Sequence, residues 1–200
     1  MSDYIFLFDL DSTLTKKEIL PEISKVIGKE DEMRRLTEET MQGVLPFKQS
    51  FISRVDILKD IAVERVQEII NSIPLNEHLI SFIKENKERC YIITGNLDIW
   101  ISPLMKRLGL NGHYFCSKAV VDSTGCVKVI SVLDKELTVK QFIQPIVSVG
   151  DGNNDADMAR YAEIAIGFGG VRDIAPALIK SIDYALMDEN RLAQFLTDLL

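Results

Sequence analysis

The sequence predicts an α/β fold: a Rossmann-like parallel sheet flanked by helices, with a small helical cap domain inserted after the first strand. Two observations lead to this prediction. Short, continuously apolar runs alternate with segments of helical periodicity, which is typical of a parallel sheet covered by helices on both faces. The segment after the first apolar run has helical periodicity alone, where a plain α/β fold would soon place a second strand. The 200 residues suffice for one core and a small accessory unit.

The expected strands are short apolar runs rich in β-branched and aromatic residues. They are Tyr4–Phe8, Cys90–Ile93, Ile146–Val149, Ile164–Ile166 and, with a weaker pattern, Tyr184–Leu186. Two further β-prone stretches between residues 119 and 130 flank Asp122-Ser123-Thr124-Gly125, which indicates a small hairpin.

The expected helices divide the chain into a core and a cap. The cap comprises residues 16–76, and its helical segments are Ile19–Val26, Glu30–Met41, Pro46–Ile61 and Val63–Ile70. The α/β core comprises residues 1–15 and 77–200, with helices expected at Leu97–Leu108, Asn154–Tyr161 and Glu189–Leu200. Gly109 follows the first of these helices, where a C-terminal cap glycine belongs.

Composition excludes several classes of function. The chain has 23 basic and 30 acidic residues, a net charge of -7, so it repels a polyanion and is not expected to bind nucleic acid. No apolar run approaches the ~18–20 residues of a membrane span, and Met1–Leu10 lacks the basic start of a signal peptide. Cys90, Cys116 and Cys126 have no metal-type spacing and are expected to be buried or idle thiols. We therefore expect a cytoplasmic protein.

Polar clusters follow three of the expected strands directly. They are Asp9-Leu10-Asp11-Ser12-Thr13, Thr94-Gly95-Asn96 and Gly150-Asp151-Gly152-Asn153-Asn154-Asp155. Because the carboxyl ends of parallel strands share one edge of the sheet, where ligand sites usually lie, the three clusters should meet in space.

Four carboxylates in these clusters, Asp9, Asp11, Asp151 and Asp155, would repel one another unless a cation lay among them. Oxygen ligands without nearby His or Cys favour a hard ion that keeps several waters, so the expected cofactor is Mg²⁺ rather than Zn²⁺. The alternative is that these acids are helix caps and turn formers, for which Asp is common.

A magnesium ion beside hydroxyl and amide donors suits phosphoryl transfer, in which catalysis is mostly positioning and charge neutralisation. The donors here are Thr94, Asn96 and the amides around Gly95. Asp9 ends a strand and could attack phosphorus directly, forming an aspartyl-phosphate. Asp11 could then protonate the leaving oxygen and later deprotonate water.

The three clusters, together with a lysine near residues 135–140, resemble the four ordered motifs of the haloacid dehalogenase superfamily of phosphatases over essentially the whole chain. The resemblance implies that Asp9 is the nucleophile and Asp11 the acid and base. It implies magnesium ligands from Asp9, the Asp11 backbone carbonyl and Asp151, with Asp155 supporting the metal site.

The resemblance also implies that Thr94, Gly95 and a lysine hold the phosphate. Lys135 begins a helical stretch before the third polar strand end, as the family's lysine does, whereas Lys140 lies within the helix and could be a solvated surface charge. We favour Lys135 and keep Lys140 as the alternative.

The cap carries a candidate substrate-binding face. Phe47, Phe51, Val55 and Leu58 lie on one helix face, and Arg54 lies on the same face. An arginine there needs a partner, which a carboxylate-bearing substrate would supply. Alternatively, Arg54 extends to solvent or pairs with an acid of the cap.

Glu18, Met41, Phe47 and Arg54 are similar in type and spacing to the substrate-binding residues of the phosphoserine phosphatase family. The resemblance implies that the glutamate binds the amino group and the arginine the carboxylate; by itself, Glu18 could simply complement a helix dipole. Asn96 and Asn154 are further candidate substrate contacts. Asn96 is a departure, because that family usually has Ser-Gly-Gly where this chain has Thr94-Gly95-Asn96.

The expected function is therefore magnesium-dependent hydrolysis of a small phosphorylated metabolite, with phosphoserine as a candidate. One alternative keeps the fold and passes the phosphate to another alcohol. Another is a receiver-like phosphorylation switch, which the helical insertion and the acid at Asp11 disfavour. A dinucleotide site is disfavoured because Gly150-Asp151-Gly152 lacks the third glycine of the fingerprint.

Overall fold

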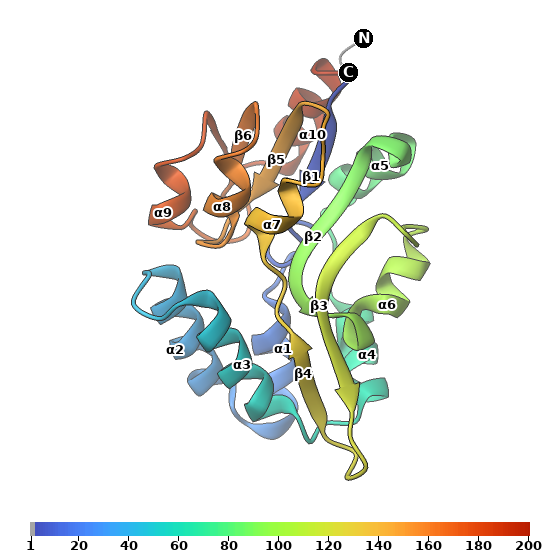
Figure 1. The fold of residues 1–200 in the computed structure, drawn as a ribbon, viewed down its shortest axis with the longest axis vertical. Helices are drawn as coiled ribbons and strands as arrows, with labels where there is room; N and C mark the ends of the chain where they lie inside the picture. The colour runs from blue at the N-terminus through green and yellow to red at the C-terminus, as the bar shows by residue number, and fades with distance from the viewer. Residues whose placement is uncertain (1–2) are drawn as a thin grey trace.

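Within residues 3–200, which the computed structural model describes, seven strands form one sheet in the order β4-β3-β2-β1-β5-β6-β7 (Figure 1). In chain order the strands are β1 (Ile5–Phe8), β2 (Cys90–Leu97), β3 (Tyr114–Val121), β4 (Val127–Ser131), β5 (Ile146–Gly150), β6 (Ile164–Phe168) and β7 (Tyr184–Leu186). All neighbouring strands are parallel except β3 and β4, which are antiparallel.

Helices cover both faces of the sheet, which explains why the strands are continuously apolar. On one face, Phe6 and Phe8 of β1 pack with buried residues of α5 (Glu77–Glu85) and α10 (Glu189–Asp198). Leu7 points to the other face, because side chains alternate along a strand, and there it packs with residues of α7 (Lys135–Val139) and α8 (Asp155–Ala159). β1 is thereby held rigidly in the centre of the fold.

Four helices follow β1 and lie beyond the carboxyl ends of the central strands (Figure 1). They are α1 (Ile19–Ser24), α2 (Glu30–Met41), α3 (Phe47–Leu58) and α4 (Val63–Ser72). α4 also packs against α6 (Asp98–Arg107), a helix that follows β2. The division of the chain into a cap of residues 16–76 and a core of residues 1–15 and 77–200 stays a prediction. Residues 1 and 2 of the predicted core lie outside the described part of the chain.

The hairpin of β3 and β4 extends from the sheet alongside α3 (Figure 1). The backbone amide of Val127 donates to the carbonyl of Lys59, the residue after α3, at 2.9 Å. This hydrogen bond joins the outer end of the sheet to the layer formed by helices α1 to α4, the helical layer.

The predicted fold class is confirmed, and most predicted elements are present with ends shifted by a few residues. The predicted hairpin between residues 119 and 130 forms, and β3 also pairs with β2, an extension of the main sheet that the sequence did not predict. β2 is longer than the predicted Cys90–Ile93 and includes Thr94-Gly95-Asn96, with a register irregularity between Thr94 and Leu97. The helices α5 and α9 (Pro176–Ile179) were not predicted.

Among residues 3–200, no helix combines the length and the apolar character that crossing a bilayer requires.

Candidate active site

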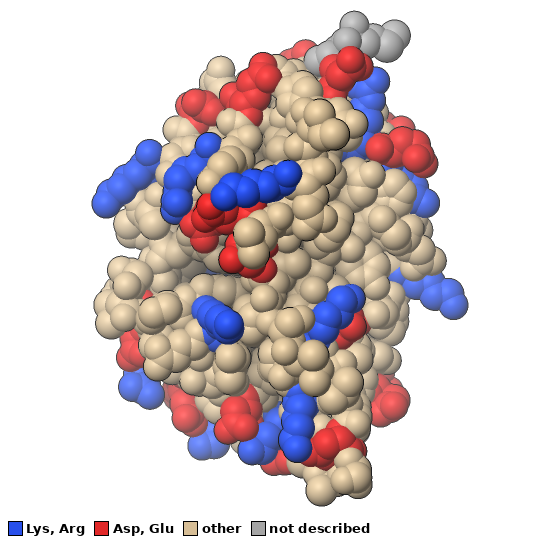
Figure 2. Space-filling view, in the orientation of Figure 1, with Lys and Arg blue, Asp and Glu red and all other residues tan. Residues whose placement is uncertain are grey.

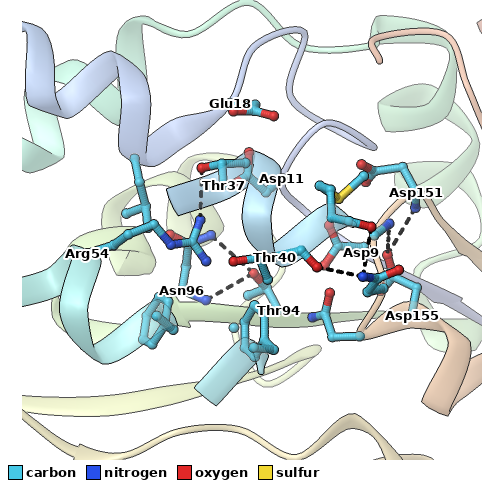
Figure 3. Close-up of a pocket in the computed structure, with 18 of the residues that line it drawn as sticks. Asp9, Asp11, Glu18, Thr37, Thr40, Arg54, Thr94, Asn96, Asp151 and Asp155 are labelled. Carbon is cyan, nitrogen blue, oxygen red and sulfur yellow. Dashed lines mark hydrogen bonds between the residues drawn. The ribbon is translucent and has the colours of Figure 1, made fainter. Parts of the chain in front are cut away.

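A pocket lies between the carboxyl ends of the central strands and the helices that follow β1 (Figure 3). Figure 2 shows the molecular surface hollowed between these two parts, with charged side chains of both signs around the hollow. The sheet side contributes Asp9, Asp11, Thr94, Gly95, Asn96, Asp151, Gly152, Asn153, Asn154, Asp155 and Arg172. The helical side contributes Glu18, Leu20, Pro21, Thr37, Thr40, Met41, Phe47, Phe51 and Arg54. The three polar clusters therefore meet, as the sequence predicts.

Asp9 follows β1 directly, so the sheet fixes its backbone: its amide donates to the carbonyl of Val149 at 2.9 Å. The carboxylate is buried and accepts a hydrogen bond from the ammonium group of Lys135. Burial raises the pKa of Asp9 to about 7, with the neighbouring carboxylates of Asp155 and Asp151 adding to the rise and Lys135 opposing it. A carboxylate held this way is positioned but poorly solvated.

The turn after Asp9 contains one strained residue and several hydrogen bonds between its own residues. Ser12 has a φ of 60°, in the left-handed region that non-glycine residues rarely adopt. Its amide donates to Oγ1 of Thr15 at 3.0 Å, and the amides of Leu14 and Thr15 donate to the carbonyl of Leu10, both at 3.0 Å. These bonds hold the turn in the conformation that places Asp11 beside Asp9.

Asp11 lies on the pocket wall, and its Oδ1 accepts from the amide of Ile19 at 2.9 Å. Burial raises the pKa of Asp11 to about 7, although the guanidinium of Arg172 lowers it in part. A carboxyl group with a pKa near neutrality can exchange a proton in both directions, as an acid and base must.

The loop after β5 is closed by Asp155. Its Oδ2 accepts from the amides of Asp151 and Gly152, at 2.9 and 2.7 Å, and its Oδ1 lies 2.5 Å from Nζ of Lys135. A side chain at Gly150 would collide with the Asp155 carboxylate, so glycine is required there for this close approach. Asp151 accepts from Oγ1 of Thr13 at 3.2 Å, and burial raises its pKa to about 7.

Asp9, Asp151 and Asp155 form a group suited to a metal ion, since one carboxylate oxygen of each lies within 4.8 Å of the others. Oxygen ligands around one octahedral ion with bonds of about 2.1 Å lie within about 4.2 Å of one another, which is inside this limit. Among residues 3–200, five carboxylates surround the pocket, Glu18 and Asp11 included, against three cationic side chains, which leaves two formal negative charges. A divalent cation fits both the donor atoms and this excess charge.

Of the two candidate lysines, Lys135 is in the site. It is buried and bonds both Asp9 and Asp155, and these carboxylates raise its pKa despite the opposing effect of burial. Lys140 is exposed, pairs with Glu136 at 2.6 Å and lies over the ring of Tyr161.

The segment Thr94-Gly95-Asn96 lies in the wall of the pocket as part of β2, and not in a loop after it. Oγ1 of Thr94 accepts from both nitrogen atoms of Asn96, the backbone amide at 3.2 Å and Nδ2 at 3.3 Å. The ring of Phe47 packs directly on Gly95, where any side chain would collide with it. Oγ of Ser117, in the neighbouring strand β3, donates to the Gly95 carbonyl at 2.6 Å and so holds Gly95 in place.

Arg54 is buried without an ionic partner. Its side chain donates one hydrogen bond, from Nη1 to Oγ1 of Thr37 at 3.2 Å, and its Nε has no partner. In the described part of the chain no carboxylate lies within 4 Å of the guanidinium, and burial lowers its pKa to about 10. Neither predicted alternative, an exposed side chain or a pair within the cap, is present.

The remaining predicted residues line the same pocket. Met41 ends α2, Phe47 begins α3 and stacks on Phe51 with 5.8 Å between ring centroids, and Asn154 precedes α8. Asn153, which was not a candidate, donates from Nδ2 to the carbonyl oxygens of Thr40 and Met41, at 2.5 and 2.8 Å. Asn153 therefore joins residues 151–154, the acidic loop between β5 and α8, to the helical layer.

Arg172 is the main residue of the site that sequence reasoning missed. Its guanidinium pairs with Asp151 through Nε and with Glu18 through Nη1, so it joins the acidic loop to the start of α1. The carboxylates of Asp151 and Glu18 raise its pKa against the effect of burial. Arg172 lies in the loop after β6, whose carboxyl end reaches the same edge of the sheet; that placement was a usable signal.

Comparisons with known proteins agree with this geometry. Residues 5–163 match the model of the haloacid dehalogenase-like hydrolase family. The phosphoserine phosphatase of Methanocaldococcus jannaschii is 35% identical over 179 residues, which cover 82% of this chain and 84% of that protein. The human phosphoserine phosphatase is 27% identical, over 82% of this chain and 80% of that protein.

Two solved structures superpose over 100% of both chains at 29% identity. One is an analogue of the phospho-aspartyl intermediate of a phosphoserine phosphatase, with a TM-score of 0.84, and the other is a substrate-bound phosphoserine phosphatase, with a TM-score of 0.83. With the family model spanning most of the chain, and with relatives of this kind over its whole fold, the chain belongs to the haloacid dehalogenase-like hydrolase family.

Proposed function

We propose that the protein is a Mg²⁺-dependent phosphomonoester hydrolase that acts through an aspartyl-phosphate on Asp9, with phosphoserine as its first candidate substrate. The observation that carries this proposal is the setting of Asp9. Its buried carboxylate follows a central strand directly, lies among Asp151, Asp155 and Lys135, and lines the pocket. The relatives named phosphoserine phosphatase support the same chemistry.

In the first step, a carboxylate oxygen of Asp9 attacks phosphorus and the bond from phosphorus to the ester oxygen breaks. Asp11 gives its proton to the leaving oxygen; a pKa of about 7 keeps part of Asp11 protonated at neutral pH. In the second step, Asp11 takes a proton from water, the water oxygen attacks phosphorus, and the bond between phosphorus and Asp9 breaks. Inorganic phosphate leaves and both carboxyl groups return to their starting states.

The residues that would hold Mg²⁺ are Asp9, Asp151 and the backbone carbonyl of Asp11, with Asp155 in support. Bound there, the ion supplies positive charge against the phosphoryl oxygens and the acidic cluster. Lys135 supplies a second positive charge beside the Asp9 carboxylate, and Thr94 offers its hydroxyl from β2. Together these groups neutralise the charge that a transferring phosphoryl group carries.

Arg54 is the proposed partner of a substrate carboxylate. It is buried on the pocket wall, lacks an ionic partner and has an unbonded Nε, so a carboxylate can satisfy it with paired hydrogen bonds. Phe47 and Phe51 form the apolar wall next to it. This wall and this charge fit a small phosphorylated acid.

The decisive experiment measures phosphate release from O-phosphoserine with Mg²⁺ and with chelator, in the natural enzyme and in Asp9→Asn. We expect multiple turnover that requires the metal, and a loss of roughly 10³-fold or more in kcat for Asp9→Asn. Asp31→Asn, at an exposed carboxylate of α2 that does not line the pocket, is the matched control.

Two outcomes would contradict the proposal. Stoichiometric labelling of the protein without turnover would make it a phosphorylation switch. Transfer of the phosphate to an added alcohol in preference to water would make it a phosphotransferase.

We also propose a cytoplasmic location. Cys90, Cys116 and Cys126 are free thiols in the described part of the chain, which suits a reducing compartment.

A further inference from the structure

Three residues that line the pocket have a buried polar atom without any partner among residues 3–200: Arg54 through Nε, and Asn96 and Asn153 through Oδ1. Asn153 is held by its Nδ2 bonds to the end of α2, whereas Arg54 and Asn96 lie together on one side of the pocket (Figure 3). Arg54 is 7% exposed and Asn96 is 4% exposed. Both nitrogen atoms of Asn96 are committed to Thr94, which leaves Oδ1 as its free group. Buried polar groups nearly always have a hydrogen-bond partner, so we expect a bound ligand to supply partners for Nε of Arg54 and Oδ1 of Asn96.

The two atoms would bind different groups of a ligand, one an acceptor and the other a donor. Arg54 offers a donor with a positive charge, and Asn96 offers a neutral acceptor. Figure 3 shows Arg54, Asn96 and Thr37 gathered on one side of the pocket, with Asp9, Asp151 and Asp155 on the other and Thr94 between them. When the phosphate of a substrate lies near Asp9, its organic part therefore lies near Nε of Arg54 and Oδ1 of Asn96.

Glu18 is in a different situation. Its carboxylate is paired with Arg172, which also holds Asp151, so Glu18 already has an ionic partner within the protein. In Figure 3 Glu18 lies apart from Arg54 and Asn96. An ammonium group bound at Glu18 would have to compete with a guanidinium that two carboxylates hold.

We propose that the substrate is the phosphate monoester of a small carboxylic acid with a hydrogen-bond donor on carbon 2, and that Asn96, rather than Glu18, binds this donor. The proposal rests on the phosphatase function proposed above and names its specificity-determining residue. Arg54 binds the carboxylate, Oδ1 of Asn96 accepts from the donor, and Glu18 with Arg172 positions the acidic loop.

A consequence concerns selectivity. A neutral amide oxygen accepts from an ammonium or from a hydroxyl group, whereas a free carboxylate would strongly favour the ammonium through a charge-assisted bond. The enzyme should therefore treat 2-amino and 2-hydroxy acids alike, within about tenfold in kcat/KM. It should disfavour an acid without the donor by roughly ten- to a hundredfold, because Oδ1 then stays unpaired.

The test compares three esters that differ only at carbon 2: O-phosphoserine, glycerate 3-phosphate and 3-phosphooxypropanoate. Each is assayed with the natural enzyme, Asn96→Ala and Glu18→Gln. The readout is the ratio of kcat/KM between esters within one variant, because the fraction of folded enzyme cancels in that ratio. A purely structural role of Asn96 would lower all three values and leave the ratios unchanged.

We expect the preference for the two donor-bearing esters to disappear in Asn96→Ala and to persist in Glu18→Gln. Asn96→Asp, which adds a carboxylate at the same position, should raise the ratio of O-phosphoserine to glycerate 3-phosphate by roughly tenfold or more. Loss of the preference in Glu18→Gln with its retention in Asn96→Ala would overturn the proposal. So would a natural enzyme that prefers O-phosphoserine to glycerate 3-phosphate by about a thousandfold.

These failures differ from a failure of the proposed function. If O-phosphoserine is hydrolysed but depends on Glu18, the inference about Asn96 is wrong and the phosphatase stands. If p-nitrophenyl phosphate is hydrolysed and none of the three acids is, the carboxylate substrate class is wrong as well. If no phosphate ester is hydrolysed, both proposals fall.

Discussion

Nζ of Lys135 lies 2.5 Å from Oδ1 of Asp155, and both side chains are almost fully buried. The same ammonium group also bonds Asp9, so one cation holds together carboxylates from two loops that are far apart in sequence. Lys135 therefore contributes to the stability of the site as well as to its charge.

We predict that Lys135→Met destabilises the metal-free protein by roughly 3–5 kcal/mol, because the variant leaves buried carboxylates without their partner. Added Mg²⁺ should restore part of the loss. Denaturant unfolding at pH 8, with and without Mg²⁺, measures both effects. Lys140→Met is the matched control: its exposed pair with Glu136 should matter little, and equal losses in the two variants would refute the prediction.

The pH dependence of stability should be unusual without metal. Burial raises the pKa values of Asp9, Asp11 and Asp151 to about 7, from 3.8 in an unfolded chain. The folded state then binds more protons than the unfolded state between these values, so stability is lost as the pH rises toward and through about 7. Melting temperatures in chelator should therefore fall between pH 5.5 and pH 8.

Magnesium should reverse that trend, since it binds the ionised carboxylates. We expect a larger rise in melting temperature on adding Mg²⁺ at pH 8 than at pH 5.5. Asp151→Asn should weaken both the pH dependence in chelator and the response to the metal. A rise of equal size at both pH values would contradict the assignment of these groups.

Asp11→Asn should affect substrates according to their leaving groups. An alkoxide such as that of serine needs a proton from Asp11, whereas p-nitrophenolate leaves readily without one. We expect kcat to fall roughly 10²–10⁴-fold for O-phosphoserine and much less for p-nitrophenyl phosphate. The same loss for both esters would show that Asp11 acts on a step other than departure of the leaving group.

The sequence was sufficient for the location of the site, for a physical reason. Parallel strands end at one edge of the sheet, so the residues that follow them must converge, as Asp9, Asp151 and Asp155 do. The continuous apolar character of β1 and β5 identified those strands before any contact was known.

The parts that could not be predicted depend on contacts between distant segments. Arg172 pairs with Glu18 across 154 positions, and nothing in the local pattern of either residue selects the other. The unbonded Oδ1 of Asn96 likewise cannot be predicted from the sequence. It follows from the structure, in which both nitrogen atoms of Asn96 donate to Oγ1 of Thr94 and Oδ1 has no partner. The sequence predicts β3 only as half of a hairpin, because its pairing with β2 depends on the sheet as a whole.

The contact of Phe47 with Gly95 supports a last prediction. A Cβ at residue 95 would collide with the Phe47 ring, with Cε1 only 3.0 Å away, although the backbone of Gly95 is not in the left-handed region. Gly95→Ala should therefore act through the ring and not through backbone strain. It should displace α3, the helix that carries Arg54, and raise KM for O-phosphoserine.

Phe47→Leu frees this space, so the double variant Gly95→Ala, Phe47→Leu should lose less than the two single variants combined. We expect a coupling of roughly 0.5–3 kcal/mol in a double-mutant cycle on kcat/KM. The methyl group added at residue 95 then fills the volume that the smaller leucine side chain leaves, so the helical layer can approach β2 again. Strictly additive losses would mean that the contact between the ring and the glycine does not set the position of α3 over the pocket.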